Sequence, residues 1–210
     1  MDQKNILQHV ESFIREKFEH EGTGHDWWHI HRVRNLALRI GKAEHADLFI
    51  VELGALLHDI ADFKFNEGDL KAGPRAAREL LTEQGLDEDT IQRICHIVEH
   101  VSCKGADVEN GMQSLEGKVV QDADRMDALG AIGIARVFAY GGSKNRGLYD
   151  PNHKPTLHKT FEEYKNKNST SINHFYEKLL LLKDKMNTET GKALAQKRHE
   201  YLEPMKTCYA

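Results

Sequence analysis

The chain is poor in the residues that mark exported, thiolate-based or membrane-spanning proteins. Its 210 residues include three cysteines, Cys95, Cys103 and Cys208, an odd number without CxxC spacing. This argues against a disulfide framework and against a thiolate zinc site, and it predicts a reducing, cytoplasmic environment. The longest apolar runs, such as FIVELGALL, fall far short of the roughly 20 residues of a membrane span. The N-terminus also lacks the layout of a secretion signal.

Basic residues also do not outnumber acidic ones. The 29 lysines and arginines stand against 33 acidic residues, which gives a net charge of −4. Such a surface offers no general attraction to nucleic-acid polymers or to anionic membranes, so we expect neither partner. A small basic pocket is still compatible with this balance.

Proline is scarce, with four residues, and this favours long helices. Helical periodicity recurs along nearly the whole chain; a strand pair within 103–115 is the only conceivable exception. The expected helices cover approximately residues 4–18, 27–42, 46–61, 75–84, 88–102, 115–140, 172–186 and 188–205. We therefore predict an all-α fold in which residues 1–210 form a single domain.

One long connection interrupts the helical pattern. Residues 141–156, GGSKNRGLYDPNHKPT, are rich in glycine and contain two prolines. A connection of this length inside a compact domain is typically a lid, a binding loop or a disordered segment. We expect it to be an excursion that is more mobile than the core.

Three histidines lie within the seven residues that begin at His25. With a step of about 100° per residue, His29 shares a helical face with Val33 and Ile40 and should be buried. His31 points to a more polar side and should be exposed, while His25 lies at or before the start of the helix. A single inward histidine is commonly a core residue bonded to the backbone, so a chemical role needs further support.

Two more helices point ligand-type side chains inward. His58 lies on the inward stripe of VELGALLHDIAD, and Asp59 follows it directly. A carboxylate at the end of an apolar helix is costly to bury unless it is paired or holds a cation; the alternative is a solvated helix-terminal acid. In KVVQDADRMDALG, Asp122 shares a stripe with Val119 and Met126, so it is the predicted inward acid.

The inward set is therefore His29, His58, Asp59 and Asp122. Two imidazoles and two carboxylates suit one divalent manganese, iron, cobalt, nickel or magnesium ion rather than a structural zinc site. On an ion that takes about six ligands, this set leaves positions for water or substrate oxygen, which is the layout of a catalytic metal.

The order His … His-Asp … Asp resembles that of the HD superfamily of metal-dependent phosphohydrolases. The stretches HDWWHIHRV, LLHDIAD and VVQDADRMDALGAIGIARVF, and the tail HFYEKLLLLKDKMNTETGKALAQKR, resemble a subgroup of small, single-domain bacterial HD proteins. The likeness covers about residues 25–198. It implies an all-α HD helical bundle and the hydrolysis of a phosphate ester or anhydride in a nucleotide-like substrate.

Some members of this family bind two metal ions through additional histidines that are spaced further apart than His96 and His100 are here. We therefore expect one metal ion and assign these two histidines to the pocket wall; the alternative is that one is a plain surface residue. Asp62, one turn after His58, is a candidate for accepting a proton from water or for holding the water in place. His25 is a candidate for contacting phosphate or moving a proton.

Cations should neutralise the charge of the phosphate groups. The candidates for substrate binding are Arg32, Lys64, Arg75, His96, His100, Arg125, Lys144 and Arg146, the last two on the glycine-rich connection. For each of these cations, the alternative is an ordinary solvated surface charge.

Three functions fit this pattern. The favoured one is hydrolysis of a nucleoside or deoxynucleoside triphosphate with release of pyrophosphate or phosphate. The second is the same chemistry on a nucleoside monophosphate or an alarmone. The third is a metal-bound module that senses a nucleotide without turnover. The intact set of metal ligands argues against this third function. The partner is thus expected to be a small phosphorylated molecule, and the protein a monomer or homodimer.

Overall fold

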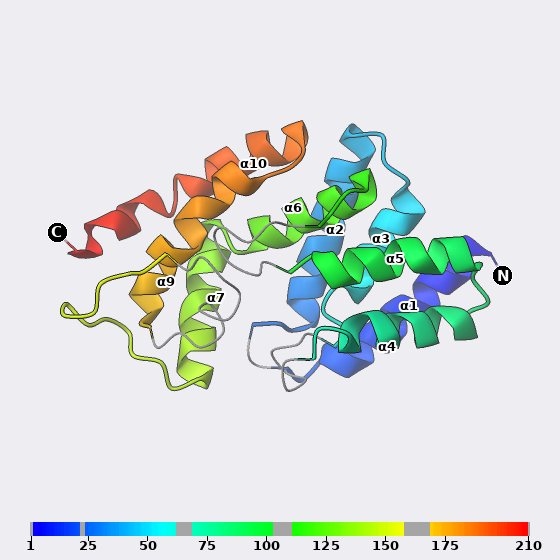
Figure 1. The fold of residues 1–210 in the computed structure, drawn as a ribbon, viewed down its shortest axis with the longest axis horizontal. Coiled ribbons are helices and arrows are strands. Elements are labelled where there is room, and N and C mark those ends of the chain that lie inside the picture. The colour runs from blue at the N-terminus through cyan, green and yellow to red at the C-terminus, as the bar shows by residue number, and fades with distance from the viewer. Residues whose placement is uncertain (1, 22–23, 62–68, 103–110, 158–168, 210) are drawn as a thin grey trace. The chain divides into compact units, whose positions relative to one another are not determined.

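A computed structural model describes residues 2–21, 24–61, 69–102, 111–157 and 169–209, and the regular structure in these ranges is helical (Figure 1). The α-helices are α1 (Gln3–Phe18), α2 (Trp27–Ala43), α3 (Leu48–Leu57), α4 (Ala72–Glu83), α5 (Glu88–His100), α6 (Leu115–Asp127), α7 (Gly130–Ser143), α9 (Ser171–Glu177) and α10 (Glu189–His199). Two 3₁₀ helices complete the set, η2 (Leu179–Lys185) and η3 (Glu203–Tyr209). The prediction of an all-α chain is confirmed. Among the described helices, none combines the length and the apolar character that crossing a membrane requires.

Two of the expected helices are each divided. The helix expected over 115–140 stops at Asp127, because Leu129 is extended and Gly130 has a φ of +74°. Glycine reaches this left-handed region without the steric penalty of a Cβ, so the chain can turn there and begin α7. The helix expected over 172–186 changes from α9 to the tighter η2. Hydrophobic periodicity alone reveals neither change.

The chain divides into two compact units. Unit 1 comprises Met1–Glu21, His25–Ser102 and Gly111–Ala123, and unit 2 comprises Gly22–Gly24, Cys103–Asn110 and Asp124–Ala210. A division of this kind also occurs within single domains, so the expectation of one domain stays a prediction.

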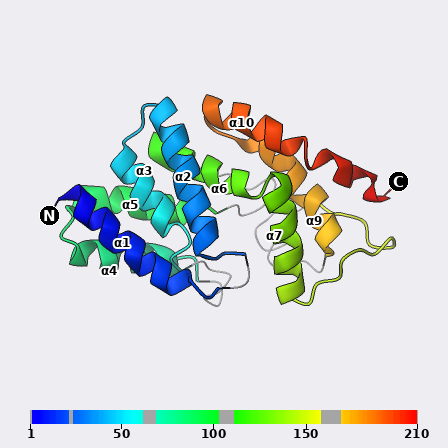
Figure 2. The ribbon, with the colours of Figure 1, turned by 180° about the vertical axis from the view of Figure 1, so that it is seen from behind.

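In unit 1, α3 is the central helix. It packs against α1, α2 and α5, and α5 packs against α4 (Figures 1 and 2). The sequence of α3 is apolar on nearly all sides, and Leu53, Leu56 and Leu57 are accordingly fully buried. The buried helix at the centre of unit 1 thus ends directly before His58 in the chain.

In unit 2, α7 packs against α9 and α10, and η2 packs against α9 and α10; Phe175 of α9 and Leu179 of η2 are buried. The glycine-rich connection runs beside α9 and is bonded to it. The Nδ2 group of Asn173 donates to the carbonyl of His153 at 3.0 Å, and the amide of Ser171 donates to the carbonyl of Gly147 at 2.9 Å. These bonds argue against a freely moving lid.

Candidate metal centre

The first part of the centre is set by the N-terminus of α2. Asp26 precedes the helix in extended conformation, and its Oδ1 accepts the backbone N–H of His29 at 2.8 Å. This N-cap fixes the first turn of α2, so that His29 points into unit 1 and is fully buried, as its helical face predicts. The sequence signal for this cap is an aspartate directly before a helical stripe.

Removal of this cap gives a first testable effect. Asp26→Ala will lower the free energy of unfolding by about 1 kcal/mol, because an amide of the first turn of α2 loses its acceptor. Asp26→Ser keeps a capping oxygen and should recover most of the loss. Urea unfolding of the two variants beside the wild type checks this; equal midpoints for the alanine and serine variants would contradict it.

The expected exposure of His31 is wrong. This side chain is half-buried, and its ring contacts the rings of Trp27 and Trp28 with centroids 5.7 Å and 5.8 Å apart. Trp27 is buried, whereas Trp28 is 58% exposed. The adjacent tryptophans cover a position that the helical pattern alone assigns to solvent.

The second part of the centre follows the end of α3. The Nδ1–H group of His58 donates to the carbonyl of Ala55 at 2.8 Å, which leaves the lone pair of the neutral ring on Nε2. His58 and Asp59 are both buried. A histidine held in this way by a backbone carbonyl has the tautomer and orientation of a metal ligand.

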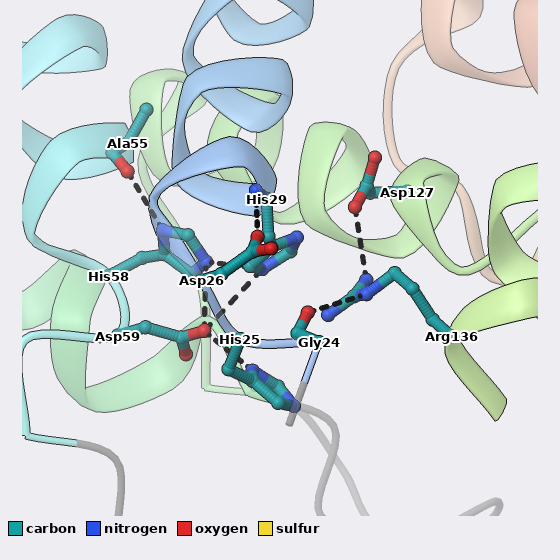
Figure 3. Close-up of polar contacts among 9 residues, drawn as sticks. All are labelled: Gly24, His25, Asp26, His29, Ala55, His58, Asp59, Asp127 and Arg136. Carbon is teal, nitrogen blue, oxygen red and sulfur yellow. Dashed lines mark hydrogen bonds and ion pairs between the residues drawn. The ribbon is translucent and has the colours of Figure 1, made fainter. Parts of the chain in front are cut away.

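Three donor atoms converge in unit 1 (Figure 3). Nε2 of His29 lies 3.1 Å from Nε2 of His58. Oδ2 of Asp59 lies 3.4 Å from the first nitrogen and 3.5 Å from the second. Donors about 2.1 Å from a common ion, at angles between octahedral and tetrahedral, are separated by roughly 3.0–3.4 Å. The three residues therefore fit one face of a divalent ion.

His25 adds a hydrogen bond to this face. Its Nδ1–H group donates to Oδ2 of Asp59 at 2.8 Å. Burial raises the pKa of Asp59, but the imidazoles of His58 and His25 lower it by more, so the pKa lies well below its usual value. The carboxylate is therefore ionised, the form in which it can bind a cation. His25, His29 and Asp59 also form a group that could itself hold an ion.

The acids of α6 occupy different faces. A Cβ placed on Gly54 of α3 would lie 3.4 Å from Cγ2 of Val120, so the Val120 side of α6 packs on the helix that leads to His58. Asp122 is fully buried but stands about 200° from Val120 around the helix. Asp124 follows Val120 by one turn, so it stands on the same side of α6 as Val120.

The other predicted residues of unit 1 take varied positions. Arg32 is half-buried on α2, and Arg75 pairs at the surface with Asp69 at 2.6 Å. His96 and His100 are half-buried, and their ring centroids are 4.2 Å apart. Burial, followed by the charge of His100, lowers the pKa of His96, so this ring favours its neutral form.

In unit 2, Arg125 is buried and its Nη1 donates to the carbonyl of Lys185. Lys144 and Arg146 both lie over the ring of Tyr140, at 5.8 Å and 5.7 Å from its centroid. Their roles in substrate binding stay predictions. The roles assigned to Asp62 and Lys64 fall outside the described residues.

Comparison with known proteins shows the family of the chain. The family model for the HD domain matches residues 27–129. YpgQ of Bacillus subtilis is 37% identical over 203 residues, which cover 96% of this chain and 91% of YpgQ. The crystal structure of YpgQ in complex with ADP has a TM-score of 0.73 at 36% identity and covers 96% of this chain and 94% of that one.

Two further structures extend the similarity. A Lactobacillus plantarum protein has a TM-score of 0.87 at 38% identity, over 99% of this chain and 96% of that one. An HD-superfamily hydrolase from Bacillus thuringiensis has a TM-score of 0.72 at 40% identity, over 98% and 95% of the two chains. With relatives of this identity along almost its entire length, and with the paired histidine and aspartate buried at the end of α3, the chain belongs to the HD superfamily of hydrolases.

Proposed function

We propose that the protein is a metal-dependent phosphohydrolase whose substrate is a nucleoside or deoxynucleoside triphosphate, cleaved with release of pyrophosphate or phosphate. The observation that carries the proposal is the buried face formed by His29, His58 and Asp59, whose donor atoms have the spacing of ligands on one ion. The complex of the related YpgQ with ADP favours a nucleotide as the ligand.

We infer that the fourth ligand is Asp124 rather than the predicted Asp122. The packing of Val120 on Gly54 supports this choice, because Asp124 lies on the same side of α6 as Val120, whereas Asp122 does not. The donor chemistry supports it too, since the imidazoles of His29 and His58 and the carboxylate of Asp124 form a set that could hold one metal ion.

A divalent ion bound by these residues would supply a water of lowered pKa and positive charge beside the phosphate. Asp59 remains ionised next to His25 and accepts its Nδ1–H bond, which fixes the tautomer of that ring. The Nε2 atom of His25 is then the proton acceptor of the neutral ring, suited to receive a proton from water or, once protonated, to donate to a phosphate oxygen. Burial of the three donors strengthens these interactions, because the local dielectric constant is low.

A nucleotide panel tests the function. Nucleoside and deoxynucleoside triphosphates, monophosphates and alarmones are incubated with manganese, cobalt or magnesium, and the release of phosphate and of pyrophosphate is measured. We expect turnover of at least one triphosphate and its loss on addition of EDTA. Turnover of monophosphates or alarmones alone would move the assignment to those substrates. Nucleotide binding without release under every condition would make the protein a sensor and overturn the proposal.

A further inference from the structure

An ion pair in unit 2 holds the peptide that leads into His25 (Figure 3). Arg136 of α7 donates from Nε to the carbonyl of Gly24 at 2.8 Å. Its Nη1 donates to Oδ2 of Asp127 at 3.1 Å, and Asp127, the last residue of α6, is buried. One guanidinium thus joins a buried carboxylate to the carbonyl of Gly24, the residue that precedes His25.

The geometry of this contact restricts the position of Gly24. The guanidinium is planar and presents its N–H groups in a rigid fork, so a carboxylate bound at Nη1 also fixes the direction of Nε. Gly24 has a φ of +87°, and a Cβ placed on it would lie 3.7 Å from Cγ of Arg136. The residue is therefore held by a directed hydrogen bond in a conformation that favours glycine.

Holding the Gly24 carbonyl also orients His25. The carbonyl of Gly24 and the N–H and Cα of His25 belong to one planar peptide unit. An arginine that fixes the direction of this carbonyl therefore fixes the plane from which the side chain of His25 extends. That side chain reaches Oδ2 of Asp59 at 2.8 Å, and because hydrogen bonds weaken steeply away from their preferred geometry, a rotation of the peptide should weaken this bond.

We propose that Arg136, oriented by Asp127, is a positioning residue for His25: it holds the Gly24–His25 peptide so that Nδ1 of His25 meets Asp59. Arg136 touches neither the donor face nor the substrate in this role; it acts through His25. The consequence for turnover rests on the proposed function, whereas the consequence for the hydrogen bond between His25 and Asp59 does not.

A double-mutant cycle on the full-length protein tests the route of action. Arg136→Ala should reduce kcat by about 10–100-fold, the range for loss of a group that supports metal ligands. In a His25→Ala background the same change should cost less than twofold, because the residue through which Arg136 acts is gone. Arg39→Ala, which removes an exposed arginine of α2, is the matched control and should leave kcat unchanged.

A second readout does not depend on turnover. In the ¹⁵N-labelled, metal-free protein, long-range imidazole spectra report the bond of Nδ1–H of His25 to Asp59, with the signal assigned by its absence in His25→Ala. Arg136→Ala should shift and broaden this signal, while Arg39→Ala should not. If the wild type hydrolyses no nucleotide, the proposed function fails and the spectra still decide the role of Arg136.

Equal losses of kcat in both backgrounds, together with an unchanged His25 signal, would overturn the proposal and leave Arg136 with a purely structural role. The melting temperatures of the variants, compared with that of the wild type, show whether a substitution has impaired folding. If Arg136→Ala does not fold, Arg136→Lys carries the same cycle, since it keeps the charge but lacks the rigid fork that bonds both groups.

Discussion

Asp59→Ala will reduce hydrolysis by about 10³-fold and remove most of the affinity for divalent metal. The carboxylate is buried between His25, His29 and His58, and its ionised form contributes the negative charge of this donor face. Metal ions contribute several kcal/mol to stabilising the charge of a transition state, and each 1.36 kcal/mol corresponds to a tenfold change in rate, so losing the ion costs about three orders of magnitude.

The comparison needs metal titration by calorimetry and kcat/KM on the best nucleotide of the panel. The variant should keep the helical circular dichroism spectrum, because the apolar body of α3 is untouched. Asp89→Ala, at an exposed position in the first turn of α5, is the matched control and should behave as wild type. Full activity of Asp59→Ala at ordinary manganese concentration would rule out the proposed ligand set.

The burial of His29 and His58 was predictable from the two helices that carry or precede them. On α2, His29 shares a face with the buried Val33 and Ile40, so the pattern places it inward, whereas the same pattern does not show that Trp27 is buried on another side. Likewise, α3 is central and its last turn leads His58 into the interior. Because α3 is buried on nearly all sides, a residue that directly follows its last turn is buried whichever way it points.

On α6, periodicity alone does not select one acid, because this helix is buried on more than one side. Val119, Val120, Ala123 and Met126 are all fully buried. The stripe of Val119 and Met126 led to Asp122, and the stripe of Val120 leads to Asp124; the sequence does not say which stripe meets α3. The packing of Val120 on Gly54 favours the second stripe, and that contact joins residues 66 positions apart.

Contacts between distant residues account for most of what the sequence did not predict. His25 was placed at the mouth of α2, but its bond to Asp59 spans 34 positions and depends on how α2 and α3 pack. The hydrogen bond from Arg136 to the carbonyl of Gly24 spans 112 positions. No local pattern encodes such pairs, whereas the all-α fold follows from patterns repeated within each helix.

The second large effect is expected at Asp124 of α6. Asp124→Asn will lower kcat/KM by about 10³-fold and weaken metal binding. Asp122→Asn will leave kcat/KM and the metal affinity within about threefold of the wild type. The first change removes the charge of a proposed ligand, for which the estimate made for Asp59 holds. Asp122→Asn alters a fully buried side chain on another face of α6. It should therefore reduce the free energy of unfolding by about 1–3 kcal/mol, because it disturbs a buried polar contact.

The two variants are matched controls for each other, because they make the same substitution two residues apart on one helix. Calorimetric titration with manganese and urea unfolding of the metal-free proteins separate loss of a ligand from loss of stability. The reverse pattern, with metal binding lost in Asp122→Asn and kept in Asp124→Asn, would restore the acid that the sequence pattern predicted. It would also mean that the side of α6 that packs on Gly54 does not lead to the metal centre.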